Sequence, residues 1–550
     1  MSKILISSTS FLLQSNNIWK NISKNNQIEF SEYGKIFSSF KSYDIEINLL
    51  FLPDIIDYFK SENTEVEIKK ISNTIKLIES HLKKTSANII IGFSDYLIHN
   101  NLSYSTDKYF FNKYKLFFVD NLNILKKKYR NLFILDLDLL FANSGFNKSF
   151  SQRNFYLMNC RLSLQGLISL SKELSKFIKI ISTNPKKVLI LDCDNTIWGG
   201  VLAEDGFNKI KIGQDGIGKA FSDFQKVAKK IKNNGTLLVL ASKNEKSDVK
   251  KVLNSHRAMI LKDSDITSYK VNWEEKSKNI LELSNDLMLG LDSFVFWDDN
   301  PIERAKVKKK LPSVYVFEPK ADVSDWPKQL SEYQGFMKIN SSKEDEKKTI
   351  QYKQRDKFLE KKKLFNDELK YLKNIKIKIK KEKVNNSNID RAVQLTHKTN
   401  QFNFTTRRYN HNRILYFNKK NYVTLFNLTD IYGNHGIISL LILKQFKDFL
   451  LIDTFLLSCR ILGRYVENYI LRYSQQLSKK KKLKGVIIQY IKTKRNSPAL
   501  NFIDSLKILN KLSKPELINI LGKQKKIIQK NSIYYLLKNE DKIINSKIYE

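Results

Sequence analysis

Short apolar runs alternate with longer lysine-rich segments along the first third of the chain. The runs span residues 3–6, 45–52, 87–93 and 132–136, and the lysine-rich segments between them read as helices. Strands that alternate with helices are typical of an α/β domain with a parallel sheet. We therefore predict an α/β domain over residues 1–184.

The pattern starts again after the breaker Asn184-Pro185, with the apolar strand VLILD, and it predicts a second α/β domain over residues 185–335. A strongly charged segment follows, and we predict a solvated helical linker over residues 336–374. Beyond it, the apolar runs GIISLLILK and FLLIDTFLLS read as an antiparallel hairpin of a mixed α/β domain over residues 375–550. The predicted fold class is α/β multidomain.

Composition changes this picture little. The chain has 550 residues, of which 42% are hydrophobic, which suits several packed cores and excludes a mainly disordered protein. A net charge of +40 suggests nucleic acid, but lysine far outnumbers arginine, and isoleucine and asparagine abound, as A- and T-rich codons produce. We therefore expect no nucleic-acid partner.

The three cysteines, Cys160, Cys193 and Cys459, lie far apart without a CxxC pair, so the sequence indicates neither a disulfide framework nor a zinc site. No uninterrupted apolar stretch approaches the length of a membrane span. The opening MSKILISSTSFLLQ reads as a strand rather than a signal peptide. We expect a cytoplasmic protein without a membrane span.

The most specific pattern is VLILDCDNTIWGG, in which a buried-looking strand ends in Asp192, Asp194 and Thr196. Open α/β sheets bind their ligands at the carboxyl ends of the strands. A purely structural acidic turn would leave the two carboxylates repelling each other without any gain. The pattern therefore indicates a catalytic or metal-binding edge.

Three further elements follow in the order that a haloacid-dehalogenase (HAD) type phosphotransferase needs. The strand TLLVLAS ends in Ser242, whose hydroxyl can hold a phosphoryl oxygen, and Lys276 can offset charge in the transition state. The strand SFVFW leads into Asp298 and Asp299, and grouped carboxylates suit Mg²⁺. The order predicts Mg²⁺-dependent phosphoryl transfer, with Lys270 as a weaker candidate for the role of Lys276.

The string DCDNTIWGGVLAEDG, with SKNE, NWEEK and FVFWDDNP after it, resembles the FkbH family, a branch of the HAD superfamily with a subfamily IIIC-like phosphatase domain. The resemblance implies that Asp192 is the nucleophile that forms an aspartyl phosphate and that Asp194 is the general acid and base. It also implies a metal held by Asp192, by the carbonyl of Asp194 and by one of Asp298 or Asp299.

The stretch between Thr196 and Ser242 is short and leaves little room for a cap domain. We therefore expect a capless, Rossmannoid HAD domain, in which Thr196 contacts the substrate. An open site of this kind suits a phosphate on a large or carrier-borne substrate.

The strings QLTHKTNQFNFTTRRY, DIYGNHGII and DTFLLSCRILGR resemble the last domain of the same family, which has a GNAT-like acyltransferase fold. The first region corresponds in position to the family's SGNH-hydrolase-like α/β domain. It lacks the GDS nucleophile motif, and Ser7 and Ser8 are the hydroxyls that follow its first strand.

The FkbH family is associated with taking a glyceryl group from the acyl phosphate of 1,3-bisphosphoglycerate, removing phosphate and loading glycerate as a thioester onto an acyl carrier protein. The resemblance therefore implies a small phosphorylated substrate and a carrier-protein partner. Two alternatives stay open. One is a HAD phosphatase fused to a GNAT-type N-acyltransferase of surface-polysaccharide synthesis, and the other is a non-catalytic scaffold that binds a carrier.

In acetyltransferase-like folds, a strand leads into a loop whose amides hold the pyrophosphate of coenzyme A at a helix N-terminus. The corresponding loop here is RILGRY, which predicts Arg460, Gly463 and Arg464 as cofactor-binding residues. The usual pattern has a small residue where this chain has Tyr465. We therefore favour the phosphopantetheine arm of a carrier protein over acetyl-CoA.

Cys459 is the cysteine that we expect to carry an acyl group. It precedes Arg460 at the start of a predicted helix, and both features favour a thiolate, whereas Cys193 lies between two carboxylates. Counting back from a hairpin turn at residues 446–448 places His435 opposite Cys459 to within about a residue, which predicts a Cys-His pair. The alternative is a buried structural cysteine beside a polar histidine.

Arg407 and Arg408 follow the string QFNFTT. Their guanidinium groups match phosphate geometry, so they are candidates for binding a substrate phosphate or an acidic carrier helix. Surface salt bridges are the alternative.

Overall fold

The computed structural model describes residues 2–37, 42–58, 64–96, 108–129, 131–337, 348–365, 367–420, 422–493, 495–521, 531–546 and 548–549. Three separate sheets form within these ranges. The chain divides into two compact units, of which the first ends at Pro185 and the second begins at Lys186. No helix within the described ranges combines the length and the apolar character that crossing a membrane requires.

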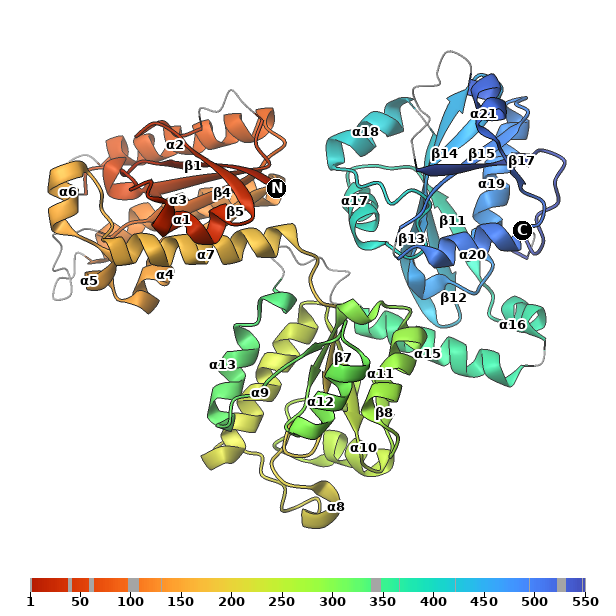
Figure 1. Cartoon of the computed structure of the whole chain (residues 1–550), viewed down its shortest axis with the longest axis horizontal. Coiled ribbons are helices and arrows are strands. Elements are labelled where there is room, and N and C mark those ends of the chain that lie inside the picture. Colours follow the sequence, from red (N-terminus) through yellow and green to blue (C-terminus); the bar gives the residue numbers. More distant parts are fainter. Residues whose placement is uncertain are drawn as a thin grey trace. The chain divides into compact units, whose positions relative to one another are not determined.

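The first unit is built on a parallel sheet with the strand order β2-β1-β3-β4-β5. Isoleucine-rich strands are buried on both faces, with α1 and α7 packed on one face and α2 and α3 on the other (Figure 1). The strands are β1 (Ser2–Ser8), β2 (Asn26–Phe30), β3 (Ile45–Phe51), β4 (Asn88–Ser94) and β5 (Leu132–Asp136). The helices are α1 (Asn16–Ser23), α2 (Thr64–Lys84), α3 (Lys108–Lys128), α4 (Leu137–Ser144), α5 (Phe146–Ser149), α6 (Gln152–Met158) and α7 (Leu164–Ser182).

The parallel α/β arrangement of this region is confirmed. The hydrophobic pattern did not predict β2. This strand lies at the edge of the sheet, where its residues are only partly buried and its apolar signal is weak.

The second sheet is also parallel, with the order β10-β9-β6-β7-β8. The central strand β6 lies between β9 and β7, so the carboxyl ends of these strands meet at one edge. The strands are β6 (Val188–Leu191), β7 (Leu237–Ser242), β8 (Ile266–Val271), β9 (Phe294–Trp297) and β10 (Tyr315–Val316). The helices are α8 (Leu202–Asp205), α9 (Gly216–Asn233), α10 (Lys246–Ser255), α11 (Lys276–Leu287), α12 (Pro301–Lys310) and α13 (Trp326–Ser331).

The charged segment after this domain forms α15 (Lys348–Leu364) and α16 (Glu368–Asn374). The expectation of a solvated linker is wrong for α15. Tyr352 is 8% exposed and packs into the core of the second sheet, while Phe358 is 1% exposed and packs into the core of the third. Two aromatic side chains among many lysines suffice to bury one face of the helix.

The third sheet is mixed, with the order β11-β12-β13-β14-β15-β17-β16. Its pairs are antiparallel except β14 with β15. The expected hairpin joins β13 to β14 and turns between Phe446 and Phe449. The strands are β11 (Lys378–Glu382), β12 (Tyr422–Asp430), β13 (Gly433–Phe446), β14 (Phe449–Leu457), β15 (Gly485–Ile491), β16 (Asn510–Lys511) and β17 (Ser532–Lys538). The helices are α17 (Ile389–Lys398), α18 (His411–Lys420), α19 (Val466–Lys480), α20 (Ser497–Ser505) and α21 (Lys514–Leu521).

The two parallel strands of this sheet separate beyond Ile452, and the segment from Phe402 to Phe404 fills the gap. The Phe404 N–H donates to the Phe455 carbonyl of β14 at 3.0 Å, and the Phe404 carbonyl accepts from the Ile491 N–H of β15 at 2.8 Å. Both phenyl rings are buried. The chain therefore closes this opening with its own backbone.

Candidate active site

Polar side chains gather where three neighbouring strands of the second sheet end. Asp192 follows β6, Ser242 ends β7 and Asp298 follows β9. The Asp192 N–H donates to the Trp297 carbonyl at 3.1 Å, which extends the strand ladder by one residue. The backbone of the sheet therefore holds Asp192 and Asp298 side by side.

Lys276, the first residue of α11, bridges the two carboxylates. Its Nζ lies 2.8 Å from Asp192 Oδ1 and 2.6 Å from Asp298 Oδ2, and none of the three residues is more than 6% exposed. Burial alone would lower the pKa of Lys276, but the two carboxylates raise it above its usual value. Lys276 therefore stays cationic beside the expected nucleophile.

The pKa of Asp192 is raised to about 7. Burial is the main cause, Lys276 opposes the shift and the charge of Asp298 adds to it. Burial and then Asp298 also raise the pKa of Asp299. Such crowding of carboxylates is unfavourable unless positive charge balances it.

The carboxylates of Asp192, Asp298 and Asp299 form a group that could hold a metal ion, with ligand atoms within 4.8 Å of one another. Arg304 Nη1 donates to the carbonyls of Asp298 and Asp299 at 3.0 and 2.6 Å and so fixes the loop that carries them. Hard oxygen ligands of this kind suit Mg²⁺. Both Asp298 and Asp299 belong to the group, whereas the sequence left the choice between them open.

The Asp194 carboxylate points away from this group and accepts three hydrogen bonds. Oδ1 accepts from Trp198 Nε1 and from the Leu202 N–H, each at 3.0 Å, and Oδ2 accepts from Asn244 Nδ2 at 2.9 Å. These contacts fix the orientation of the carboxylate, and the role in proton transfer that the resemblance implies stays a prediction.

Asn244 was missed by the sequence reasoning. Its Nδ2 also donates to Ser242 Oγ at 3.1 Å, so one buried amide ties Asp194 to Ser242. The available signal was an amide two residues after the serine that ends a strand. That signal is weak without the fold, because Asn is common in loops after strands.

Thr196 was expected to contact the substrate, but its side chain is fully buried. Its hydroxyl oxygen lies 3.4 Å from Asp299 Oδ1, to which it donates, and accepts from the Asp299 N–H at 3.3 Å. Thr196 therefore positions a carboxylate of the metal group. Lys270 pairs with Glu282 and Asp286, so Lys276 is the one of the two candidate lysines that contacts Asp192 and Asp298.

Cys193 is fully buried between the two acidic residues. Burial, followed by the charge of Asp192, raises the pKa of its thiol well above the usual value. This environment agrees with the expectation that the carboxylates on either side disfavour a thiolate at Cys193.

Cys459 lines a small pocket of about 90 Å³ and is partly exposed. Burial lowers the pKa of Lys187, one of the cations in the wall of this pocket. The wall also has an apolar part formed by Leu237, Leu289 and Leu395. The cationic side chains that line the pocket are Lys187, Arg391, Lys398 and Arg460.

The expected Cys459–His435 pair is not formed. A bulge leaves Asp453 of β14 unpaired, and the register beyond it joins Ser439 to Leu457, so continuing the ladder puts Cys459 opposite Ile437. The His435 ring is buried, and its Nε2 lies 2.9 Å from Asp430 Oδ1. Counting from the turn without the bulge would place His435 opposite Arg460, and the extra residue of the bulge moves it opposite Ile461, two residues past Cys459.

The predicted cofactor loop is only partly accessible. Gly463 is exposed and has a φ of 84°, but the Arg464 guanidinium is fully buried, stacks on Phe358 and faces Asp430 at 3.7 Å. Arg464 is therefore a structural residue. Arg460 lines the Cys459 pocket and remains a candidate for ligand binding.

The two arginines of the TTRRY string differ in accessibility, because Arg407 is partly buried whereas Arg408 is exposed. Arg407 forms an ion pair with the buried Asp453 and donates to Gln489. Arg408 donates to the carbonyls of Thr396 and His397 at the end of α17. Arg407 is therefore held by an internal ion pair, whereas Arg408 lines a pocket and remains a candidate for binding a phosphate or an acidic helix.

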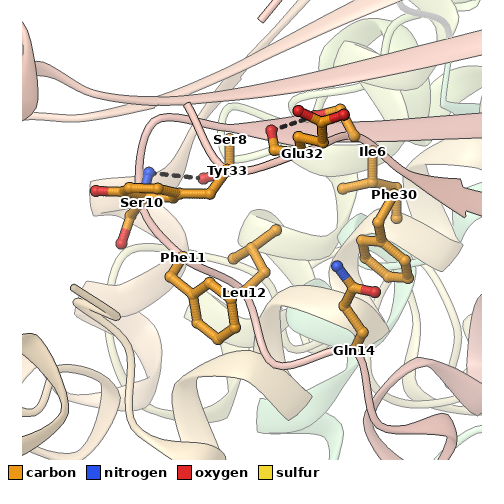
Figure 2. A pocket seen from close by; sticks show the side chains of 10 residues that line it. Ile6, Ser8, Ser10, Phe11, Leu12, Gln14, Phe30, Glu32 and Tyr33 are labelled. Atoms are coloured by element: carbon orange, nitrogen blue, oxygen red, sulfur yellow. Dashed lines mark hydrogen bonds between the residues drawn. The ribbon is translucent and has the colours of Figure 1, made fainter. Parts of the chain in front are cut away.

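In the first unit, Ser8 lines a pocket at the carboxyl end of β1, together with Ser10, Glu32 and Tyr33 (Figure 2). Ser8 Oγ accepts a hydrogen bond from the Ser10 N–H at 3.1 Å. No histidine is among the residues that line this pocket, whereas a serine nucleophile needs a base within hydrogen-bond reach. The pocket gives no support to a hydrolase role for Ser8.

No family model and no curated protein matches the chain. Its structure resembles that of the N-terminal part of the protein BF1531 from Bacteroides fragilis, which contains a phosphatase domain and is complexed with Mg. The TM-score is 0.51 at 29% identity, over 60% of this chain and 93% of that chain. The chain thus shares the fold of a phosphatase-containing protein.

Acetyltransferases also resemble part of the chain. The ribosomal-protein-S18-alanine N-acetyltransferase from Escherichia coli has a TM-score of 0.22 at 10% identity, over 30% of this chain and 97% of that chain. A GNAT-family acetyltransferase from Staphylococcus aureus Mu50 has a TM-score of 0.23 at 9% identity, over 30% and 99% of the two chains. With TM-scores this far below 0.5, these two likenesses assign no function to this part of the chain.

The carboxylate group leads to a first prediction. Asp298→Asn should weaken Mg²⁺ binding by more than the ~10- to 100-fold that loss of an outer-shell partner costs, because it removes a ligand directly. Isothermal titration calorimetry with Mg²⁺ measures this. Asp292→Asn, at a half-exposed position of the same domain, is the matched control and should bind Mg²⁺ as the native protein does. Equal affinity in both variants would show that the group holds no metal.

Proposed function

We propose that this protein is a Mg²⁺-dependent enzyme that takes a glyceryl group from an acyl phosphate and loads it as a thioester onto an acyl carrier protein. The observation that carries the proposal is the buried group of Asp192, Lys276 and Asp298. A carboxylate nucleophile next to a fixed cation is what phosphoryl transfer requires. The likeness to an Mg-bound phosphatase domain supports the phosphatase part.

The substrate dictates two separate steps. 1,3-Bisphosphoglycerate carries an acyl phosphate and a phosphate ester, and a glyceryl thioester carries neither. In one step a thiolate adds to the acyl carbonyl, the bond from that carbon to the phosphate oxygen breaks, and phosphate leaves. In the other step the ester phosphate is removed by hydrolysis.

The Asp192 centre performs the hydrolysis. Asp192 attacks the phosphorus atom, the phosphorus–oxygen bond to the glyceryl group breaks, and Asp194 gives a proton to the departing oxygen. Asp194 then takes a proton from the water molecule that attacks the aspartyl phosphate and releases phosphate. Lys276 offsets the charge on the phosphoryl group throughout. Bound Mg²⁺ would add charge neutralisation at the phosphoryl oxygens.

Cys459 is the residue of this chain that we assign to the thiol step. Arg391, Lys398 and Arg460, which line its pocket, suit the phosphates of a small acyl donor. Lys187 of that pocket precedes β6 and Asp192 follows it, which puts the backbone at these two residues about 16 Å apart at the ~3.3 Å rise of a strand. The two steps therefore take place at opposite ends of β6. The pantetheine thiol takes the acyl group from Cys459 by thioester exchange.

The second prediction concerns the nucleophile. Asp192→Asn should lower phosphate-ester hydrolysis at least about 1000-fold, because loss of a nucleophile removes the covalent route. Treatment of the native protein with EDTA should also abolish phosphate release, which a phosphate assay measures. Asp205→Asn, at an exposed position of α8 in the same domain, is the matched control. Undiminished phosphate release from the Asp192→Asn protein would exclude the proposed nucleophile.

The third prediction concerns the product. Intact-protein mass spectrometry after mixing the protein with 1,3-bisphosphoglycerate, Mg²⁺ and candidate holo-carrier proteins should find glycerate on the pantetheine thiol. Free phosphate without any adduct would instead indicate a phosphatase beside a separate N-acyltransferase. No turnover at all would indicate a scaffold.

The fourth prediction concerns the relay. Cys459→Ala should abolish carrier loading, because no thiol would remain in the cationic pocket, while Mg²⁺ binding at the Asp192 centre stays. The fully buried Cys160 offers the control, since Cys160→Ala should still load the carrier. Loading at the native rate by the Cys459→Ala protein would mean that the pantetheine thiol attacks the acyl phosphate directly.

A further inference from the structure

One tryptophan stands apart from the others. Of the five tryptophans, Trp19, Trp198, Trp297 and Trp326 are at most 4% exposed, whereas Trp273 is 65% exposed. It lies three residues before the catalytic Lys276. An exposed tryptophan costs solubility without stabilising a core, and tryptophan is enriched among the residues that dominate protein interfaces.

One loop connects this side chain to the catalytic centre. Trp273 Nε1 donates to Glu245 Oε1 at 3.2 Å, and the preceding Asn244 contacts the catalytic Asp194. Lys243 of the same loop lies 3.1 Å from Glu303 of α12. The exposed indole ring is thus fixed at the rim of the site by the residues that build the site.

Helix α12 adds an exposed stripe to the same rim. Ile302, Lys306 and Lys310 lie four residues apart, so they share one face of the helix. Ile302 is 62% exposed, and the two lysine side chains are 46% and 57% exposed. Lys310 Nζ lies 2.6 Å from Glu275 Oε2, two residues from Trp273. The last lysines of α12 also suit its C-terminal dipole, but the exposed Ile302 and Trp273 do not follow from that.

We propose that Trp273, Ile302, Lys306 and Lys310 form a docking surface for an acidic carrier protein at the mouth of the Asp192 site. Two observations indicate this occupant. The domain has no cap over its site, because α8 and α9 are the helices between Thr196 and Ser242, so the remainder of a large substrate lies outside. Helix α12 carries five basic residues and one acidic residue, which complements an acidic partner.

This surface rests on the proposed function for the identity of the partner. It extends that function by stating where the carrier protein binds while the Asp192 centre hydrolyses the phosphate ester of the thioester-bound group. Aromatic anchors surrounded by charges give affinity through the buried ring and direct the approach through the charges. The phosphopantetheine arm is not needed for such contacts. Apo and holo forms of the carrier should therefore both bind.

The test is the affinity of the full-length protein for a purified acyl carrier protein, measured in its apo and holo forms by surface plasmon resonance. Trp273→Ala should raise the Kd at least tenfold, and Trp273→Phe should restore it to within about threefold, as expected for an aromatic anchor. Lys306→Glu should raise the Kd and reduce its dependence on salt.

Two matched controls separate the surface from general effects. Tyr156→Ala removes an aromatic side chain that is 69% exposed in the first unit. Lys226→Glu breaks an i,i+3 ion pair with Asp223 on α9, comparable to the pair of Lys306 with Glu303. Both controls should bind the carrier as the native protein does.

Carrier affinity that Trp273→Ala leaves unchanged would overturn the docking surface, and so would a native protein that binds neither carrier form. An equal loss of small-phosphate hydrolysis and carrier affinity in Trp273→Ala would assign the residue to the catalytic centre instead. Carrier binding through Trp273 without any glyceryl loading would support the surface while counting against the proposed function.

Discussion

The bridge from Lys276 to Asp192 and Asp298 is the interaction on which the catalytic centre depends. Burying carboxylates next to one another costs several kcal/mol for each ion, unless a partner of opposite charge is buried with them. Lys276 provides that partner from the first turn of α11, while the ladder of β6 and β9 holds the carboxylates in place. The sheet, the helix start and the charge balance therefore form a single arrangement, and loss of the lysine would leave two buried charges unpaired.

In the C-terminal domain, two arginines that the sequence suggested for ligand binding form buried ion pairs instead. Arg464 faces Asp430, and Arg407 pairs with Asp453, in each case across a wide gap in sequence. A guanidinium recognises a protein carboxylate and a substrate phosphate by the same geometry, so residue type alone does not separate the two uses. The position of the carboxylate decides between them.

The two proposed chemical steps follow the polarity of the central sheet. Carboxyl ends of parallel strands collect the acidic residues of phosphoryl transfer, and the amino end of β6 borders the pocket of Cys459. The backbone segment from Phe402 to Phe404 fills the opening between β14 and β15. The proposed pantetheine arm would therefore enter the Cys459 pocket and not this opening. Separate sites for acyl and phosphoryl chemistry require a mobile carrier of the acyl group.

The hydrophobic pattern predicted the parallel sheets and the acidic residues at their carboxyl ends, because an apolar run that ends in carboxylates places the run in the core and the carboxylates at the edge. The sequence also identified Lys276 from its order among these elements. The contacts between side chains of different elements, such as the hydrogen bond from Asn244 to Asp194, follow only from the tertiary structure. The bulge at Asp453 shifts the hairpin register and helps to separate Cys459 from His435. Such contacts depend on register and packing, which change with a single inserted residue that leaves the hydrophobic pattern intact.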